Sequence, residues 1–177
     1  PTVKGEVSFC CAVPVTASDE YAAGVRWGMQ VAKDLIAVRL APDRRLAVMG
    51  SPWYFRDKPI PKTPQDLTHH NCVNLRLPTR GGLYPWEFEK RGHELKVRVD
   101  GQLVLNSLEM RLNSALAGIG LVFILEDMVL PYIAKGKLVR VLDDWCEPFS
   151  GYHLYYASRR QHTAAFAALL DALKYQH

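Results

Sequence analysis

The sequence lacks the cysteine pairs and long apolar segments typical of disulfide-rich or membrane-spanning proteins. Its 177 residues hold four cysteines but no Cys-x-x-Cys motif, so a zinc knuckle or thioredoxin-like site is not supported. The longest apolar run, residues 120–125, is far too short to cross a bilayer. The chain begins at Pro1 without an export signal, so we expect a fragment or processed chain that is soluble, cytoplasmic and reduced, with no membrane partner.

A large excess of one charge is also missing. The formal net charge is +4, and the densest basic spots are the pairs Arg44-Arg45 and Arg159-Arg160. Nucleic-acid-binding domains usually gather Lys and Arg on one face, so we interpret these scattered charges as solvated surface. The 49% hydrophobic content suffices for one sizeable core or two small ones.

Recognisable catalytic motifs are absent as well. The sequence has no Gly-x-Ser-x-Gly elbow, P-loop or dinucleotide fingerprint. His69-His70 would diverge by about 100° on a helix, which favours a solvated helix end over a metal site. Asp143-Asp144 and Glu126-Asp127 are adjacent in sequence only, so surface or capping roles are the default. We therefore predict no catalytic residue, no bound metal and no cofactor.

Two side-chain groups leave a functional interpretation open. Cys72 could act as a nucleophile if a base such as His153 lay close to it, although a small buried strand residue is the commoner case. The aromatic residues 53–55, beside Ser51-Pro52, could line a pocket or could simply fill a strand-to-helix junction.

Strand and helix patterns alternate along the chain, which predicts an α/β protein with largely parallel sheets. Strand-like stretches cover residues 6–9, 46–49, 72–75, 86–88, 95–99, 103–105, 120–125, 138–142 and 152–156. Helical patterns cover residues 65–70, 106–118, 126–135 and the segment from Thr163 onward. Asn106 is the expected N-cap of the second helix, and Asp100-Gly101 is expected to form a two-residue turn.

Several segments together resemble the C-terminal domain of LysR-type transcriptional regulators. They are residues 21–28, 46–55, 63–67 with His70 and Cys72, 86–88, 99–103 with Asn106, 115–121, 136–142 with Trp145, and 155–160. Their order and spacing over nearly the whole chain carry the resemblance. It implies a two-lobed, periplasmic-binding-protein-like (type 2) α/β fold with two crossover strands. Lobe I would comprise residues 1–45 and 142–177, and lobe II residues 46–141.

The resemblance also implies a sensor without catalytic activity. A small-molecule effector would sit between the lobes, and the domain would self-associate as a dimer or tetramer. DNA would be contacted only through a helix-turn-helix domain that precedes this one and is missing from the chain. Pro1 to Val3 resemble the family's second strand, so the first strand and helix of lobe I are expected to be absent. The alternatives are a solute-binding protein of a transport system, which would require export, and a small α/β enzyme, which the absent motifs disfavour.

Nine residues are predicted to bind the effector: Cys11, Arg26, Gly50, Ser51, Asn74, Arg76, Asn106, Ser107 and Phe123. The helix opening at Asn106 and Ser107 would aim its positive end at the cleft, so a carboxylate would suit it. Arg26 matches a family position near the cleft and could hold an anion with two hydrogen bonds, or form an ordinary ion pair.

The other predicted ligands follow from their expected places in the lobes. Gly50 and Ser51 should lie where the chain first crosses between the lobes. Asn74, Arg76 and Phe123 should lie at strand ends that face the cleft, and Cys11 in the loop after the first visible strand. For each of them burial in the core is the competing interpretation.

Overall fold

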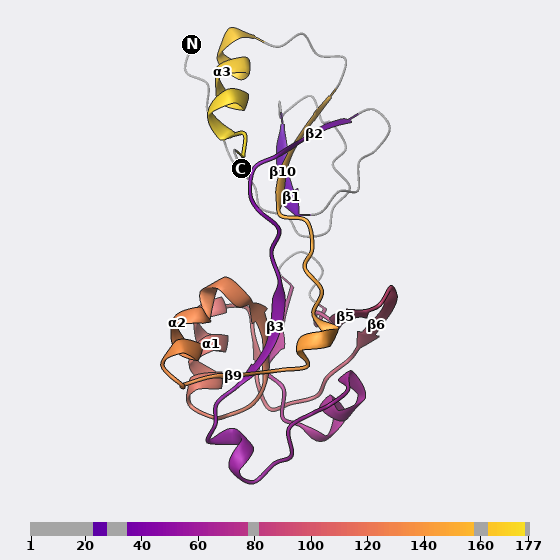
Figure 1. Ribbon diagram of the computed structural model, residues 1–177, viewed down its shortest axis with the longest axis vertical. Coiled ribbons are helices and arrows are strands. Elements are labelled where there is room, and N and C mark those ends of the chain that lie inside the picture. The colour runs from indigo at the N-terminus through magenta and orange to yellow at the C-terminus, as the bar shows by residue number, and fades with distance from the viewer. Residues whose placement is uncertain (1–22, 28–34, 78–81, 158–162, 176–177) are drawn as a thin grey trace. The chain divides into compact units, whose positions relative to one another are not determined.

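The chain divides into two compact units. Unit 1 combines residues 1–43 and 149–177, and unit 2 is the continuous stretch 44–148 (Figure 1). The computed structural model describes residues 23–27, 35–77, 82–157 and 163–175. Cys11 and the strand predicted over residues 6–9 lie outside the described residues. Within the described residues, no helix has both the length and the apolar character needed to cross a membrane.

Unit 1 contains an antiparallel sheet with the strand order β1-β10-β2. The strands are β1 (Gly24–Trp27), β10 (Tyr152–Ala157) and β2 (Leu35–Arg39). Helix α3 (Ala164–Leu173) begins after Thr163, whose hydroxyl accepts a hydrogen bond from the Phe166 N–H. The Phe166 ring meets the Tyr156 ring of β10 edge-on, with the ring centroids 5.3 Å apart. The strand and helix predicted at the C-terminal end are therefore confirmed.

The central sheet of unit 2 is antiparallel. It is formed by β8 (Val122–Leu125), β3 (Leu46–Gly50) and β9 (Val139–Val141), with β3 in the middle. The apolar run that contains β8 is buried, as predicted, but its pairing with β3 is antiparallel, with Leu46 opposite Leu125. The expectation of largely parallel sheets is therefore wrong for the described strands, because β3 enters unit 2 against the direction of β8.

Parallel pairing does occur beside this sheet. Strand β4 (Asn74–Leu75) pairs in parallel with β7 (Val104–Leu105), and Cys72 forms a parallel bridge with Leu121, just before β8. Strands β4, β7 and β8 therefore run in one direction, and their carboxyl ends meet at one edge of unit 2.

The two-residue turn lies elsewhere than predicted. Strands β5 (Trp86–Lys90) and β6 (His93–Val97) form a hairpin closed by Arg91 and Gly92, whose φ values of 54° and 78° fit a type I′ turn. At the expected site, the Asp100 carbonyl accepts a hydrogen bond from the Cys72 N–H instead. That segment leads into β7, which pairs with β4 rather than with β6.

The helices of unit 2 are short. They are the 3₁₀ turns η1 (Tyr54–Arg56), η2 (Pro64–His69), η3 (Glu126–Met128) and η4 (Asp143–Trp145), and the α-helices α1 (Leu108–Leu116) and α2 (Leu130–Ala134). The predicted helix over residues 126–135 is thus divided into η3 and α2, and Gly136, with a φ of 65°, follows its end. The N-cap of α1 is Ser107, not Asn106, because the Ser107 hydroxyl accepts the Met110 N–H at 3.3 Å.

Apolar side chains on the two faces of the central sheet form two separate clusters. On one face, Val48 and Phe123 pack with Trp86 and Phe88 of the hairpin, and the Trp86 and Phe123 rings stack at 5.4 Å. On the other face, the alternate strand residues pack under α1. This alternation is what a strand buried on both faces requires, and it fixes α1 and the hairpin on opposite sides of the sheet.

Candidate functional site

The edge where β4, β7 and β8 end is the first candidate site, and we call it the carboxyl edge of unit 2. The Val73 N–H donates to the Leu121 carbonyl at 2.8 Å, and the Arg76 N–H donates to the Leu105 carbonyl at 3.0 Å, so the three strands are held in register. Beyond β7 the chain turns into α1. Ligands of open α/β sheets bind outside the carboxyl ends of such strands.

Helix α1 presents its N-terminus at this edge. The Ser107 side chain satisfies the Met110 N–H, and the Ser107 carbonyl accepts from the Arg111 N–H at 3.2 Å. The N–H groups of Leu108 and Glu109 have no acceptor among the described residues. Free N–H groups and the positive end of the helix dipole together attract an anion.

Four of the predicted ligands gather at the carboxyl edge. Asn106 and Ser107 connect β7 to α1, while Asn74 and Arg76 lie in and just after β4, the strand paired with β7. Arg76 and Asn106 are exposed, whereas Asn74 is buried. Their binding of an effector stays a prediction, but the structure brings these four positions together.

The other predicted ligands lie elsewhere. Gly50 is the last residue of β3 and Ser51 follows it, whereas the chain enters unit 2 at Arg44 and Arg45, before the start of β3. Their expected position at the crossing is therefore wrong. Phe123 is 3% exposed and packs in the aromatic cluster, which bears out burial rather than a strand end.

One further prediction falls in unit 1. Arg26 belongs to β1, where its Cα lies opposite that of His153, and its side chain is outside the described atoms.

Sequence reasoning missed a buried arginine at the carboxyl edge. Arg111, in the first turns of α1, is 4% exposed, and its Nη2 donates to the Phe123 carbonyl. Its Nε has no hydrogen-bond partner among the described residues, and burial lowers the pKa of the guanidinium to about 10. The helical spacing contained a signal of this burial. Arg111 shares a face of α1 with Leu108 and the fully buried Ala115, so its charged side chain lies on the apolar face of the helix.

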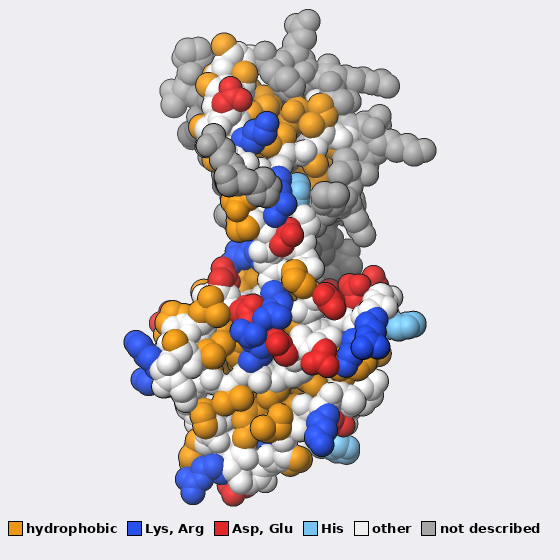
Figure 2. Space-filling model, viewed as in Figure 1, with side chains coloured by type: hydrophobic (Ala, Val, Ile, Leu, Met, Phe, Trp, Pro, Cys, Tyr) orange, Lys and Arg blue, Asp and Glu red, His pale blue; other side chains and the backbone are white. Residues whose placement is uncertain are grey.

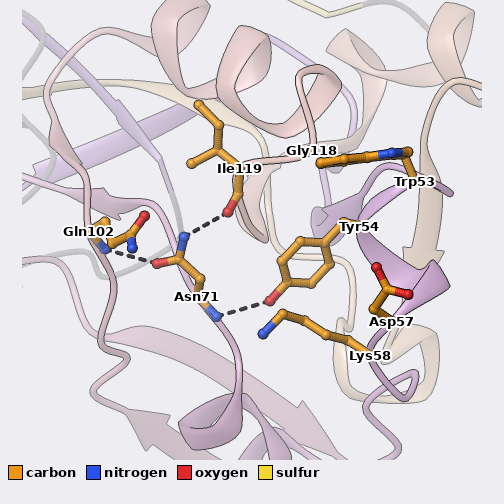
Figure 3. A pocket seen from close by; sticks show the side chains of 8 residues that line it. All are labelled: Trp53, Tyr54, Asp57, Lys58, Asn71, Gln102, Gly118 and Ile119. Carbon is orange, nitrogen blue, oxygen red and sulfur yellow. Dashed lines mark hydrogen bonds between the residues drawn. The ribbon is translucent and has the colours of Figure 1, made fainter.

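A second candidate is a pocket of about 360 Å³ near the other end of β3 (Figure 3). It is lined by Trp53, Tyr54, Asp57, Lys58, Asn71, Gln102, Gly118 and Ile119. The Asn71 amide donates to the Ile119 carbonyl and accepts from the Gln102 N–H, and the Tyr54 hydroxyl accepts from the Asn71 N–H. Because these polar groups already bond one another, they offer a ligand less than the free N–H groups of α1.

The pocket bears on the two interpretations of the aromatic residues 53–55, which were that they line a pocket or that they fill a strand-to-helix junction. Trp53 lines the pocket, Phe55 packs against the apolar cluster that contains Phe123, and Tyr54 does both, so both interpretations hold. His70 is buried beneath them with its Nδ1 3.2 Å from the Tyr54 hydroxyl, and burial lowers the pKa of its imidazole. The expected solvated helix end therefore applies to His69 alone.

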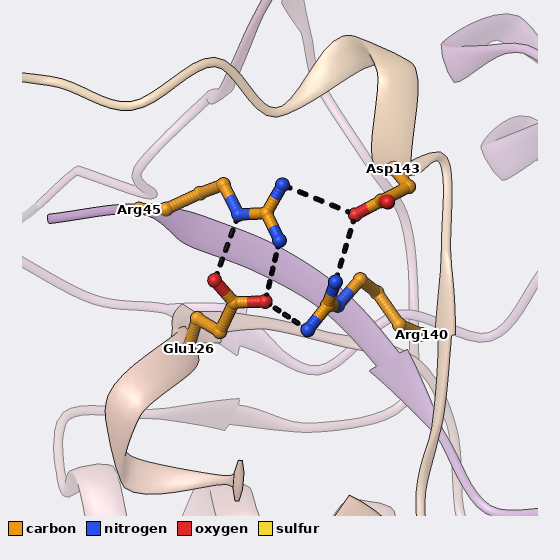
Figure 4. A network of polar contacts seen from close by, with 4 residues as sticks. All are labelled: Arg45, Glu126, Arg140 and Asp143. Atoms are coloured by element: carbon orange, nitrogen blue, oxygen red, sulfur yellow. Dashed lines mark hydrogen bonds and ion pairs between the residues drawn. The ribbon is translucent and has the colours of Figure 1, made fainter.

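The paired carboxylates have structural partners. The Glu126 carboxylate accepts from Nε and Nη2 of Arg45, at 2.8 and 2.7 Å, and also contacts Arg140 (Figure 4). Asp143 lies 3.3 Å from Arg45 and 3.1 Å from Arg140. These bonds lower the pKa of Glu126 and raise that of Arg45. The four residues, which we call the ion-pair network, connect the start of β3 with the ends of β8 and β9.

The remaining surface charges are mixed in sign. On the face of unit 2 seen in Figure 2, Lys and Arg side chains alternate with Asp and Glu. Lys90 pairs with Asp144 and Lys96 pairs with Glu87, at 2.7 and 2.6 Å. The interpretation of the basic pairs as solvated surface does not hold for Arg44 and Arg45, whose side chains are only 20% and 24% exposed and pair with carboxylates. Arg159 and Arg160 lie outside the described residues.

Comparison with known proteins gives the family. The chain matches the model of the LysR substrate binding domain over residues 15–177. The chain belongs to the LysR substrate-binding-domain family. A putative transcriptional regulator of Pseudomonas aeruginosa is 43% identical over 175 residues, which are 99% of this chain and 57% of that protein. The HTH-type transcriptional regulator PgrR of Escherichia coli is 41% identical over 159 residues, 90% of this chain and 53% of PgrR.

The chain therefore spans about half the length of the curated relatives it matches. Both relatives are named as transcriptional regulators, which does not favour the alternative of a transport protein or an enzyme.

Solved structures of LysR regulatory domains share the fold. The regulatory domain of AphB from Vibrio vulnificus has a TM-score of 0.67 and 25% identity, covering 86% of this chain and 75% of that one. The regulatory domain of CrgA from Neisseria meningitidis has a TM-score of 0.61 and 24% identity, covering 85% and 72%. The predicted two-lobed, periplasmic-binding-protein-like (type 2) fold is thereby confirmed for this LysR domain.

The cysteine of this LysR domain that was considered as a nucleophile is fully buried. Burial raises the pKa of the Cys72 thiol to about 12, so the thiolate needed for attack is scarce near neutral pH. Among the described residues, no group of three His, Cys, Asp or Glu side chains could hold a metal ion.

Proposed function

We propose that this chain is the effector-sensing domain of a bacterial transcriptional regulator and that it binds a small carboxylate metabolite at the carboxyl edge of unit 2. The observation that carries the proposal is the N-terminus of α1, beside the ends of β4, β7 and β8, where the Leu108 and Glu109 N–H groups have no acceptor in the described part of the chain. The membership of the LysR family and the names of the relatives support it.

The predicted lobes and partners belong to the same proposal. Lobe II, residues 46–141, would correspond to unit 2, and lobe I, residues 1–45 and 142–177, to unit 1. The whole regulator would be cytoplasmic, would self-associate, and would contact DNA through a helix-turn-helix domain outside this chain. Arg26 and Cys11 remain proposed ligands from lobe I.

Effector binding would act by a shift of population. A ligand changes the balance between two arrangements only as far as it binds one of them more tightly than the other. A carboxylate effector bound at the α1 N-terminus would favour those arrangements of the domain in which additional side chains also contact the effector. The shift would then reach the DNA-binding domain through the assembled regulator.

Thermal unfolding with matched small molecules tests the proposal. The chain is heated with acetate, succinate or benzoate, and in parallel with the corresponding amides. A ligand that binds only the folded chain raises the melting temperature, by an amount that grows with concentration over Kd. We expect the acids to raise it. An unchanged melting temperature with every acid and every amide would overturn the sensor role.

A further inference from the structure

Arg111 is a buried cation for which the described residues provide no anion. The side chain is 4% exposed, and its bond to the neutral Phe123 carbonyl does not compensate its charge. None of the carboxylates in the described ion pairs contacts it, and Nε donates to nothing. Buried charges in proteins are normally paired or bind a ligand, because an unpaired one costs several kcal/mol.

The guanidinium occupies a gap at the carboxyl edge. Strand β4 pairs with the β8 segment only as far as the Val73–Leu121 hydrogen bond. In a parallel ladder the next acceptor on that side is the Phe123 carbonyl, two residues on. Arg111 takes this carbonyl in place of a β4 N–H, so its head group lies where β4 and β8 separate.

The direction of the side chain agrees with this position. Helical side chains lean toward the helix N-terminus, so the Arg111 head group leans toward the first turn of α1. There the unpartnered N–H groups of Leu108 and Glu109 begin the helix. The Arg111 guanidinium also interacts with Tyr84, whose hydroxyl donates to the Glu87 carboxylate at 3.0 Å.

From this geometry we propose that Arg111 is the counter-charge for the anionic group of the effector, and that it binds a small oxyanion together with the α1 N-terminus. The inference rests on the proposed function and deepens it by naming the residue that makes the site select acids. A planar guanidinium suits a carboxylate because it can donate two parallel hydrogen bonds, which an ammonium group cannot.

A purely structural role predicts a different outcome. If Arg111 served only to close the gap beside Phe123, its replacement would lower the stability of the ligand-free chain and leave binding of acids unchanged. If it serves a ligand, an apolar side chain of similar length removes an uncompensated buried charge. The ligand-free chain then keeps or gains stability while anion binding is lost.

The test compares Arg111→Met and Arg111→Lys with the control Arg98→Met, which removes an exposed arginine from the same unit. The probes are acetate, succinate, benzoate and inorganic phosphate, with the amides of the three acids, titrated by calorimetry and by thermal unfolding. We expect Arg111→Met to weaken the bound acid at least about tenfold, Arg111→Lys to weaken it less, and Arg98→Met to match the unsubstituted chain.

The outcomes separate the two proposals. Equal affinity of the Arg111→Met and unsubstituted chains for the acids would overturn the role of Arg111 and leave the sensor role standing. If the amides bind as tightly as the acids, the role of Arg111 as a counter-charge is likewise overturned, while the sensor role remains. If Arg111→Met does not fold, the uncharged Arg111→Gln takes its place: undiminished binding of the acids by Arg111→Gln overturns the inference, and weakened binding supports it. Binding of none of the probes by the unsubstituted chain would overturn both proposals.

Discussion

Cys72 and Cys146 are buried thiols whose surroundings oppose ionisation. Burial raises the pKa of Cys72 to about 12 and that of Cys146 to about 11. Because the thiolate is the reactive form, both should resist a maleimide or disulfide reagent in the folded chain at neutral pH. In a variant with Cys10 and Cys11 replaced by Ser, we expect slow labelling without denaturant and rapid labelling of both thiols with it. Fast labelling of the folded chain would contradict their buried, protonated state.

Gly118, just after the end of α1, lies so close to the Trp53 ring that a side chain at this position should destabilise the fold. Its φ of 73° disfavours any side chain, and an added Cβ would meet the Trp53 indole ring. Gly118→Ala should therefore lower the free energy of unfolding by about 2–3 kcal/mol, measured by urea denaturation. Gly136→Ala is the matched control, because Gly136 has a φ of 65° with open space around it, and it should cost about 1–2 kcal/mol.

The steric part of the Gly118 effect can be separated. Trp53→Ala removes the ring that the new Cβ would meet, so Gly118→Ala should cost less in that background and approach the value for Gly136→Ala. An equal cost with and without Trp53 would show that the ring gives way freely.

Single residues also show where sequence reasoning reached its limit. The helix start near residue 106 was predictable from capping chemistry, but the choice between Asn106 and Ser107 as N-cap depended on backbone geometry that both side chains allow. Arg111 was missed because a charged residue on a helix is usually solvated. Its burial follows from the separation of β4 and β8, which no local pattern encodes.

At the scale of elements, the ion-pair network makes unit 2 sensitive to acid. Glu126→Gln leaves Arg45 and Arg140 with Asp143 as their shared partner, so we expect a loss of about 1–3 kcal/mol in the free energy of unfolding near pH 7. Asp127→Asn, at the next position, is the control. Asp127 is more than half exposed, and among the described residues its ion pair is with Arg44 alone, so its replacement should cost less than about 1 kcal/mol.

The pH dependence of this loss follows from the direction of the pKa shift. Hydrogen bonding to Arg45 lowers the pKa of Glu126 in the folded chain. Its stabilisation is therefore fully present above the ordinary carboxyl pKa of about 4.3 and disappears as the pH falls through the lowered folded value. Urea denaturation from about pH 7 to about pH 3 should show the unsubstituted and Glu126→Gln chains converging in acid. If the difference in free energy of unfolding between the two chains stayed the same down to acid pH, the ionised Glu126 of the ion-pair network could not be its source.

Strand direction shows the corresponding limit for elements. Alternation and apolar runs located β3, β8 and β10 correctly, since side-chain burial has a period of two residues. The same patterns do not distinguish a parallel from an antiparallel neighbour, so largely parallel sheets were expected where β8 in fact pairs antiparallel with β3. Arg91-Gly92 was overlooked as the hairpin turn because arginine rarely adopts a positive φ, whereas Asp100-Gly101 has the commoner turn composition.

At the scale of the whole molecule, the order of the segments that resemble the LysR family predicted the fold class, which local sequence patterns could not. The two-lobed class followed from segments spread over residues 21–160, whereas periodicity alone gave only alternating strands and helices. Four of the nine predicted ligands meet at the carboxyl edge because they flank strand ends. The positions of Gly50 and Phe123 depended on which end of a strand faces that edge, and this is set by pairing between distant segments.

The continuity of unit 2 leads to a prediction about independent folding. Residues 44–148 contain every member of both apolar clusters, together with the complete ion-pair network. Unit 1 instead combines two segments that are separated by the whole of unit 2, so its sheet requires β10 to return to β1 and β2. A chain of residues 44–148 should therefore unfold cooperatively in urea, followed by circular dichroism and Trp fluorescence, because its core is formed without the rest. Transitions that are broad or differ between the two probes would mean that unit 2 depends on unit 1 for its stability.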